Sequence, residues 1–394
     1  MKALEGIRVV DFSRILAGPF ATMVLADMGA EVIKVERPEK GDDSRAYGPF
    51  VHDESLYFMS VNRGKKSLEL NLKNEKAREL VLKLIDTSDV VVENFKPGVM
   101  KKLGLGYEVL SARNPRLIYC ACSGYGQTGP YSCKPAYDMI MQGLSGIMSI
   151  TGPDGAHPYR VGMSIADVDT GMFAAMGIIT ALYQREKTGR GQLVDIAMLD
   201  CMMSILENAA CRTLNTGKAP TAIGNRHVTI CPFGSIRARD GYFNIAAGND
   251  ALFVKLVDAL EAPELAGDAR FATNDLRLQH WPELEAALNE AASKRTIAEW
   301  CEIIDRAGVP VGPLNTMMEA VSHPQLEARG TVTTIPHPVA GDIRCIGTPL
   351  HLSDSERSYT HAPVLGADTA AYIEEILGCS EDEARELAVS FKEQ

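Results

Sequence analysis

Asp167 is the side chain in this sequence whose surroundings best suit covalent chemistry. It lies in the segment MSIADVDTG, directly before an apolar stretch that predicts a helix from Gly171 to Glu186. A helix N-terminus favours an ionised carboxylate, and its free N–H groups can receive an oxyanion. Asp169 competes for this role, but two residues further round the turn it would point away from a site that Asp167 faces.

The same spacing also allows a purely structural role for Asp167. Ser164 and Asp167 are three residues apart, as in a capping box, where the acidic side chain binds a free amide at the helix start. Taken alone, the spacing favours this cap. The choice between a cap and a nucleophile therefore depends on what surrounds Asp167.

Basic residues recur beside glycine or aromatic residues where predicted strands end. A ligand with phosphates and an adenine ring needs charge-assisted donors together with a flat apolar surface, and this mixture supplies both. Each charge alone is typical of a solvated surface. Their joint placement indicates a binding site that includes Arg37, Asn62–Lys65, Lys73 and Asn94–Lys96.

Three other chemistries are disfavoured by the local patterns. Glu36 stands where a dinucleotide fold has its ribose-binding acid, but the first turn, SRILAGPF, lacks the glycines of that fold. Ser123 begins a glycine-rich loop without a nucleophile elbow. The nine cysteines and eight histidines never take metal-ligand spacing, so we expect no metal. The cysteines are odd in number and scattered, so we expect reduced thiols in a cytoplasmic protein.

The elements that position these residues alternate between strand and helix. Strands are predicted at 8–12, 31–36, 89–93 and 117–122, with helices at 17–29 and 73–86, which indicates an α/β fold with a mostly parallel, Rossmann-like sheet. A polar linker near residue 215 separates a small α+β domain, in which 234–239 and 241–246 form a hairpin. Short strands follow, and helices are predicted at 369–377 and 381–391.

The net charge and composition of the chain limit the kinds of molecule that it is expected to bind. The chain has 394 residues, a net charge of −11 and 46% hydrophobic residues, so neither nucleic acid nor an anionic membrane is an expected partner. The N-terminus shows no apolar signal segment. The longest apolar stretch, Gly171–Tyr183, is shorter than a bilayer requires, and we place it in a core.

Over nearly its whole length the chain resembles the family III CoA-transferases, the group that includes formyl-CoA:oxalate and carnitine CoA-transferases. The blocks that carry the resemblance include RVVDFSRILAGPFATMVLADMGAEVIKVERPEKGD, VNRGKKSLELNLK, DVVVENFKPGVMKKLGLGYEVL, NPRLIYCACSGYGQTGP and ADVDTGMFAAMGIITALYQREKTGRGQLVDIAMLD. The resemblance implies a large domain formed from residues 1–215 and 326–394, a small domain at 216–325, and an interlocked-ring homodimer.

The resemblance also implies a site. Asp167 takes the place of the family's catalytic aspartate, and acyl-CoA is a substrate, with no tightly bound cofactor. The positions similar to the family's CoA contacts are Leu16, Ala17, Arg37, Leu70, Lys73, Asn94, Phe95, Lys102, Tyr137 and Asp138. The chain departs from formyl-CoA transferase at Leu16 and Pro135, and the segment TAIGNRHVTICPFG is nearest to that enzyme's glycine-rich closing loop.

The reaction implied by the family moves CoA from an acyl-CoA to a carboxylic acid through an anhydride and an aspartyl-CoA thioester on Asp167. Two alternatives remain open. The family's racemase branch shifts a proton beside the thioester, but it has His-Asp where this chain has Tyr137-Asp138, and tyrosine is a poor base near neutral pH. A protein that binds CoA without catalysis would keep the fold.

Overall fold

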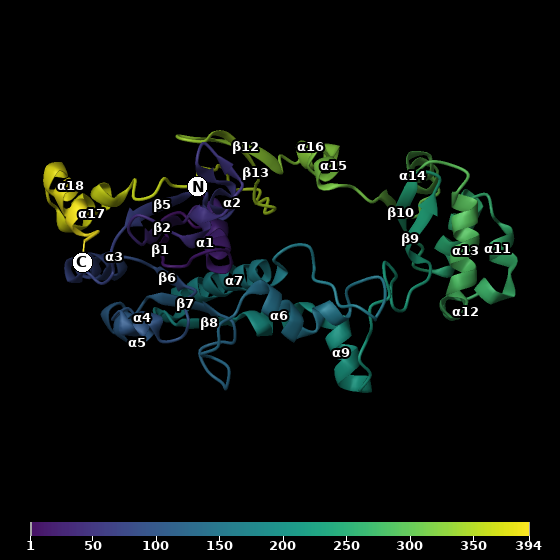
Figure 1. Ribbon diagram of the computed structural model, residues 1–394, viewed down its shortest axis with the longest axis horizontal. Coiled ribbons are helices and arrows are strands. Elements are labelled where there is room, and N and C mark those ends of the chain that lie inside the picture. Colours follow the sequence, from purple (N-terminus) through teal and green to yellow (C-terminus); the bar gives the residue numbers. More distant parts are fainter. Residues whose placement is uncertain (1, 394) are drawn as a thin grey trace. The chain divides into compact units, whose positions relative to one another are not determined.

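The computed structural model describes residues 2–393 and divides the chain into two compact units (Figure 1). The first unit contains the residues up to Met148, Arg160–Ala219 and the residues from Leu326 onward. The second unit contains Ser149–Tyr159 and Pro220–Gln325. The segment 149–159, which the sequence analysis assigned to the large domain, therefore groups with the second unit.

A six-stranded, all-parallel sheet forms the centre of the first unit, which confirms the predicted α/β class. In sheet register, Val9 lies opposite Val32 on one neighbour and Val90 on the other. The strand order, from one edge to the other, is β5 (Lys65–Glu69), β2 (Glu31–Glu36), β1 (Arg8–Asp11), β6 (Val90–Glu93), β7 (Ile118–Ser123) and β8 (Leu193–Ala197).

Helices bury both faces of this sheet, which is why its central strands are almost continuously apolar. Val9, Val32 and Val90 pack with α1 (Ala17–Asp27) and α7 (Ile165–Thr188). The alternate residues Val10, Ile33 and Val91 share a second core cluster with α3 (Glu75–Asp86), α17 (Thr369–Leu377) and α18 (Glu381–Ser390). The C-terminal helices lie beside α3 (Figure 1).

The connections reverse direction between β1 and β6. From β1 the chain passes through α1 to β2 on one side, whereas β6 lies on the other side of β1. In open parallel sheets, the crevice outside the carboxyl ends of the strands at such a switch point is the usual ligand site. The residues that follow Asp11 and Glu93 are therefore those that the topology brings together.

Helix α7 is longer than the apolar stretch suggested. It spans 24 residues, and by length and composition alone it could cross a membrane, with a mean hydropathy of 1.5 in its most apolar window. The argument from the length of Gly171–Tyr183 was therefore wrong. Packing accounts for its apolar character, since Ala174, Ile178 and Leu182 lie in the core between α1 and the sheet.

Shorter elements complete the first unit. They are β3 (Phe50–Val51), β4 (Glu54–Ser55), α2 (Leu56–Asn62), α4 (Val99–Lys102), α5 (Tyr107–Arg113), α6 (Asp138–Ser145), α8 (Met198–Ile205), α9 (Glu207–Thr216), β12 (Val332–His337) and β13 (Gly341–Ile346).

The second unit has its own antiparallel sheet and core. Its strand order is β11 (Val311–Pro313), β10 (Gly241–Ala246) and β9 (Phe233–Ala238), and the predicted hairpin is confirmed. Phe243 and Trp300 are fully buried among the surrounding helices, which are α10 (Asp250–Ala259), α11 (Glu264–Gly267), α12 (Asn274–Gln279), α13 (Trp281–Ala292) and α14 (Ile297–Arg306).

Candidate active site

A cavity of about 150 Å³ lies in the first unit where β1, β6 and β7 end. Its walls come from the loops that follow these strands, from a loop before α6 and from the start of α7. Six of the residues predicted for the site line it together: Leu16, Ala17, Asn94, Phe95, Tyr137 and Asp167. The structure thus places Asp167 in a cavity with half of the predicted CoA contacts.

A close approach of two helices brings Asp167 to this place. A Cβ atom added to Gly171 would lie 2.7 Å from the carbonyl oxygen of Ala17 and 3.0 Å from the Phe20 ring. Only glycine at this position lets α7 approach the start of α1 so closely. One turn earlier on α7, Asp167 faces the same cavity as Ala17.

The capping-box interpretation of Asp167 is wrong. Ser164 is the N-cap of α7, but its side chain makes no capping hydrogen bond. The start of the helix is held instead by Asp138, whose Oδ1 accepts a hydrogen bond from the Ala166 N–H at 3.0 Å and whose Oδ2 accepts one from Gln142 Nε2 at 2.8 Å. The Asp167 carboxylate is not needed as a cap.

Asp167 is also harder to ionise than a helix N-terminus alone would suggest. Burial raises its pKa, and the negative charge of Asp138 raises it further, to about 7. These two effects outweigh the expected stabilisation by the helix dipole. A carboxyl group with such a pKa gains or loses its proton near neutral pH, which is common among catalytic groups.

Asp169, the competing aspartate, does not line the cavity. Its side chain is 2% exposed, and within residues 2–393 neither of its carboxyl oxygens has a hydrogen-bond partner. Burial raises its pKa to about 6. Of the two aspartates, only Asp167 is placed to meet a molecule in the cavity.

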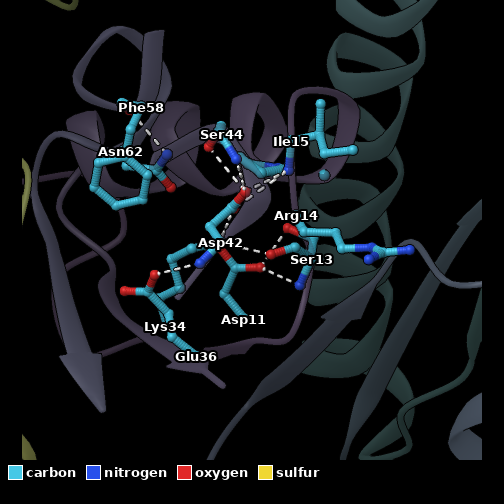
Figure 2. A network of polar contacts seen from close by, with 12 residues as sticks. Asp11, Ser13, Arg14, Ile15, Lys34, Glu36, Asp42, Ser44, Phe58 and Asn62 are labelled. Atoms are coloured by element: carbon cyan, nitrogen blue, oxygen red, sulfur yellow. Dashed lines mark hydrogen bonds and ion pairs between the residues drawn. The ribbon is translucent and has the colours of Figure 1, made fainter. Parts of the chain in front are cut away.

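The loop after β1 is held in an unusual conformation. Ile15 has a φ of 68°, which is strained for a β-branched residue. Its N–H donates to both carboxylate oxygens of Asp42, at 3.0 and 3.2 Å (Figure 2). The Asn94 side chain makes two hydrogen bonds to the same loop. Its Oδ1 accepts from the Arg14 N–H and its Nδ2 donates to the Arg14 carbonyl, both at 2.8 Å. The two switch-point loops are therefore fixed to each other.

Buried ion pairs lie beneath this loop. Lys34 Nζ lies 2.9 Å from Asp42 Oδ2 and donates to the Ser13 carbonyl at 2.6 Å. Asp11 accepts from the Ser13 N–H at 2.8 Å and from Lys65 Nζ at 3.1 Å (Figure 2 shows the Asp11, Ser13, Lys34 and Asp42 part). All four charged side chains are at most 1% exposed.

The charges of this network act against the effect of burial on the pKa, fully at Asp42 and only in part at Lys65. Burial alone would raise the pKa of Asp42, but Lys34 and two backbone N–H groups hold that pKa well below its usual value. Burial lowers the pKa of Lys65 to about 8 despite the adjacent Asp11. The sequence analysis missed Asp11, Lys34 and Asp42. For Asp11 and Lys34, a charged residue inside an otherwise apolar, doubly buried strand was the available signal, whereas Asp42 lies in the loop after β2.

A second cavity, of about 250 Å³, gathers further predicted CoA contacts. Arg37, Leu70 and Lys73 line it, and Arg14 and Phe95 line both cavities. The Arg37 guanidinium pairs with Asp43. Within residues 2–393 no ion-pair partner is found for the Lys73 ammonium group, which is free for a ligand.

Two predicted contacts lie outside both cavities. Asp138 is buried and acts on Asp167 as described above, without lining either cavity. Lys102 is exposed at the end of α4, and its neighbour Leu103 lines the second cavity. In the part of the chain that the structure describes, no group of three or more His, Cys, Asp or Glu side chains is placed to hold a metal ion.

Comparisons with known proteins show the family of this chain. The model of CoA-transferase family III matches residues 4–369. The chain is 47% identical to an acetyl-CoA:oxalate CoA-transferase of Acetobacter aceti, covering 93% of this chain and 94% of that protein. It is 39% identical to the human succinyl-CoA:glutarate CoA-transferase, covering 96% of this chain and 86% of that protein.

Solved structures show the same fold. A crystal structure of a CAIB/BAIF family protein from Brucella suis superposes with a TM-score of 0.86 at 41% identity, covering 95% of this chain and 99% of that one. The crystal structure of Rv3272 from Mycobacterium tuberculosis superposes with a TM-score of 0.85 at 32% identity, covering 94% of this chain and 99% of that one. On its sequence and fold together, this chain belongs to CoA-transferase family III.

Proposed function

We propose that this protein moves CoA from an acyl-CoA thioester to a carboxylic acid, with Asp167 carrying first the acyl group and then CoA. The observation that supports this most is the shared cavity of Asp167 and the first residues of α1. Within residues 2–393 no acceptor is found for the backbone N–H groups of Leu16 and Ala17. A nucleophile and free N–H donors therefore face one small space.

The proposed reaction proceeds by acyl transfers that balance without a co-reactant. The ionised Asp167 attacks the thioester carbonyl, the C–S bond breaks, and a mixed anhydride and CoA thiolate result. The thiolate attacks the aspartyl carbonyl, which releases the donor acid and leaves an aspartyl-CoA thioester. The acceptor carboxylate then attacks this thioester, and the same steps in reverse release the new acyl-CoA and free Asp167.

The surroundings of Asp167 suit these steps. Each attack places negative charge on a carbonyl oxygen, and the free N–H groups at the start of α1 can stabilise it. Burial keeps water from the anhydride. The raised pKa of Asp167 means that its proton must leave before the first attack, so that the ionised form grows as pH rises through about 7.

The second cavity would hold the nucleotide end of CoA. Lys73 and Arg37 supply positive charge for phosphates, and Leu70 and Phe95 supply apolar surface for the adenine ring. Because Phe95 lines both cavities, a ligand that fills the second one can extend towards Asp167. Lys102, exposed next to Leu103, would meet the outer phosphates of such a ligand.

An interlocked homodimer in the cytoplasm is the expected assembly. Large apolar side chains on α6 and α7 are about half exposed, among them Ile140 (50%), Leu144 (55%) and Met176 (60%). Such a surface favours burial against a second copy of the chain. All nine cysteines are free, in keeping with a reducing compartment. Light scattering during gel filtration tests the dimer, and a monomer at micromolar concentration would contradict it.

A transfer assay tests the function directly. The names of the relatives suggest acetyl-CoA and succinyl-CoA as donors and oxalate and glutarate as acceptors. Mass spectrometry should detect the new acyl-CoA in a reaction without ATP. The variant Asp167→Ala should form no new acyl-CoA, whereas the control Asp200→Asn, on the exposed side of α8, should form it as the wild type does. Deuterium uptake at the α-carbon without an acceptor acid, in place of transfer, would support the racemase alternative and contradict this proposal.

A further inference from the structure

Glu93, the last residue of β6, is a buried acid that the proposed reaction does not use. It is 4% exposed, and it lines neither of the two cavities described above. The three residues that follow it, Asn94, Phe95 and Lys96, all line the cavity of Asp167. Glu93 therefore lies at the base of a loop that forms one wall of the site.

The surroundings of Glu93 do not favour a negative charge. Burial raises the pKa of Glu93 to about 7, against the effect of two hydrogen bonds, and the charge of Asp195 raises this pKa further. Within residues 2–393 no cation is among the groups that act on it. An ionised acid in such a place opposes folding, so the stability of the fold alone does not account for it.

The hydrogen bonds of Glu93 fix the loop that follows. Its Oε2 accepts from the Phe95 N–H at 2.7 Å. The Tyr119 hydroxyl on β7, the neighbouring strand, donates to the same carboxylate. Within residues 2–393 no other acceptor is found for the Phe95 N–H. Glu93 thereby sets the direction in which the chain turns at the end of β6.

Phe95 is the wall that the two cavities share. The Arg14 guanidinium lies 5.6 Å from the centroid of the Phe95 ring, and Arg14 lines both cavities as well. The backbone of Arg14 is in turn bound by the Asn94 side chain. A shift of the Phe95 backbone would therefore move apolar and charged surface in both cavities.

We infer that Glu93 is a positioning residue for acyl-CoA: by accepting from the Phe95 N–H, it fixes the Phe95 ring where a ligand that spans both cavities must pass. Glu93 itself touches no ligand, and its proton takes no part in the transfer. The inference rests on the proposed function, which places CoA in these cavities. It adds a residue that acts on the affinity for CoA from beneath the site.

Calorimetric titration of CoA into the full-length protein tests the inference without any turnover. In Glu93→Met, an apolar side chain of similar length, the dissociation constant should rise about tenfold, because the Phe95 N–H loses its acceptor. Glu93→Gln keeps a carbonyl oxygen for this N–H, and its dissociation constant should stay within about twofold of the wild-type value.

Glu31 supplies a matched control. Its carboxylate also accepts from a tyrosine hydroxyl, that of Tyr372, at 2.6 Å. Glu31 is the first residue of β2, at the opposite end of the parallel sheet from Glu93, and it lines neither cavity. Glu31→Met should therefore leave the dissociation constant of CoA unchanged.

Two further measurements separate positioning from a purely structural role. In a protein that already carries Phe95→Ala, Glu93→Met should cause no further loss of CoA affinity, because Glu93 acts through Phe95. In the transfer assay, Glu93→Met should raise KM for acyl-CoA and leave KM for the acid unchanged. If Glu93→Met does not fold, Glu93→Val, a strand-forming residue without an acceptor, replaces it in every measurement.

Four results would overturn the inference. They are wild-type CoA affinity in Glu93→Met, an equal loss of affinity in Glu93→Gln, additive losses in the double variant with Phe95→Ala, and no CoA binding to the wild type. CoA binding that depends on Glu93 in a protein that transfers no CoA would uphold the inference and refute the proposed function instead.

Discussion

Asp138 Oδ1 accepts a hydrogen bond at 3.0 Å from the N–H of Ala166, the residue directly before Asp167, and the charge of Asp138 raises the pKa of Asp167. One buried carboxylate thus positions the start of α7 and makes its neighbour more basic. A more basic carboxylate is a stronger nucleophile once its proton has left. The two aspartates are therefore coupled, and of the two only Asp167 lines the cavity.

Asp138→Asn should separate these two roles. The asparagine carbonyl can still accept from Ala166, but the charge is gone, so the pKa of Asp167 should fall while burial still keeps it above its usual value. The acid limb of kcat against pH, which we expect near pH 7, should move to lower pH. Asp200→Asn serves as the control of equal charge change. An acid limb at the same pH in Asp138→Asn would show that Asp138 does not act on Asp167 electrostatically.

The contact between α1 and α7 should tolerate no side chain at Gly171. Gly171→Ala should lower the free energy of unfolding by about 1 to 3 kcal/mol, because its Cβ would overlap the Ala17 carbonyl oxygen. It should also lower kcat by moving Asp167 away from α1. Gly143→Ala on α6, where an added Cβ finds nothing closer than 3.9 Å, should instead stabilise the protein by up to about 1 kcal/mol. Denaturant unfolding of both variants decides this.

Asp42→Asn should loosen the loop after β1. The change leaves Lys34 without its ion-pair partner, and we expect a loss of about 3 kcal/mol at pH 7. Because the folded state lowers the pKa of Asp42, the stabilisation is present above the ordinary carboxyl range and is lost as pH falls below it. The difference between the two proteins should therefore shrink in acid.

The exposed pair of Asp86 and Arg113 supplies the control for that experiment. Its Asp86→Asn variant should lose less than about 1 kcal/mol, since the pair is solvated. Equal losses in Asp42→Asn and Asp86→Asn would contradict a special role for the buried network.

Lys73→Met should weaken binding of acyl-CoA and leave the chemistry intact. Loss of a charge-assisted contact to phosphate should raise KM for acyl-CoA about tenfold, with kcat unchanged. The effect should diminish at high salt, where the contact is screened. Lys76→Met, on the exposed surface of α3 and outside the cavity, should match the wild type. A fall in kcat without a change in KM would place Lys73 elsewhere in the reaction.

Much of the fold could be predicted from local patterns. The strand Glu31–Glu36 and the helix Thr369–Leu377 have the bounds that periodicity predicted. Strand β5 was missed because its sequence, KKSLE, is polar, although it pairs with β2 and Lys65 is 3% exposed. Lys65 can be buried because Asp11 lies beside it in the fold, and no pattern within one strand reveals such a partner.

The sequence indicated which residues line the cavity, but it did not indicate the raised pKa of Asp167 or its cause. Strand ends that carry Leu16, Asn94 and their neighbours meet because the sheet is parallel, which the sequence indicated. The pKa of Asp167 depends on Asp138, which is distant in sequence and reaches it through tertiary packing. The capping-box pattern failed at Ser164 because Asp138 already holds the start of α7.

The most direct test is to trap the aspartyl intermediate. Incubation of the protein with succinyl-CoA and hydroxylamine, followed by peptide mass spectrometry, should convert the Asp167 carboxyl group to a hydroxamate, because hydroxylamine displaces CoA from the aspartyl thioester. Asp167→Ala should give no hydroxamate, and Asp200→Asn should give it at residue 167. A protein that transfers CoA to glutarate while Asp167 stays unmodified would contradict the covalent role of Asp167.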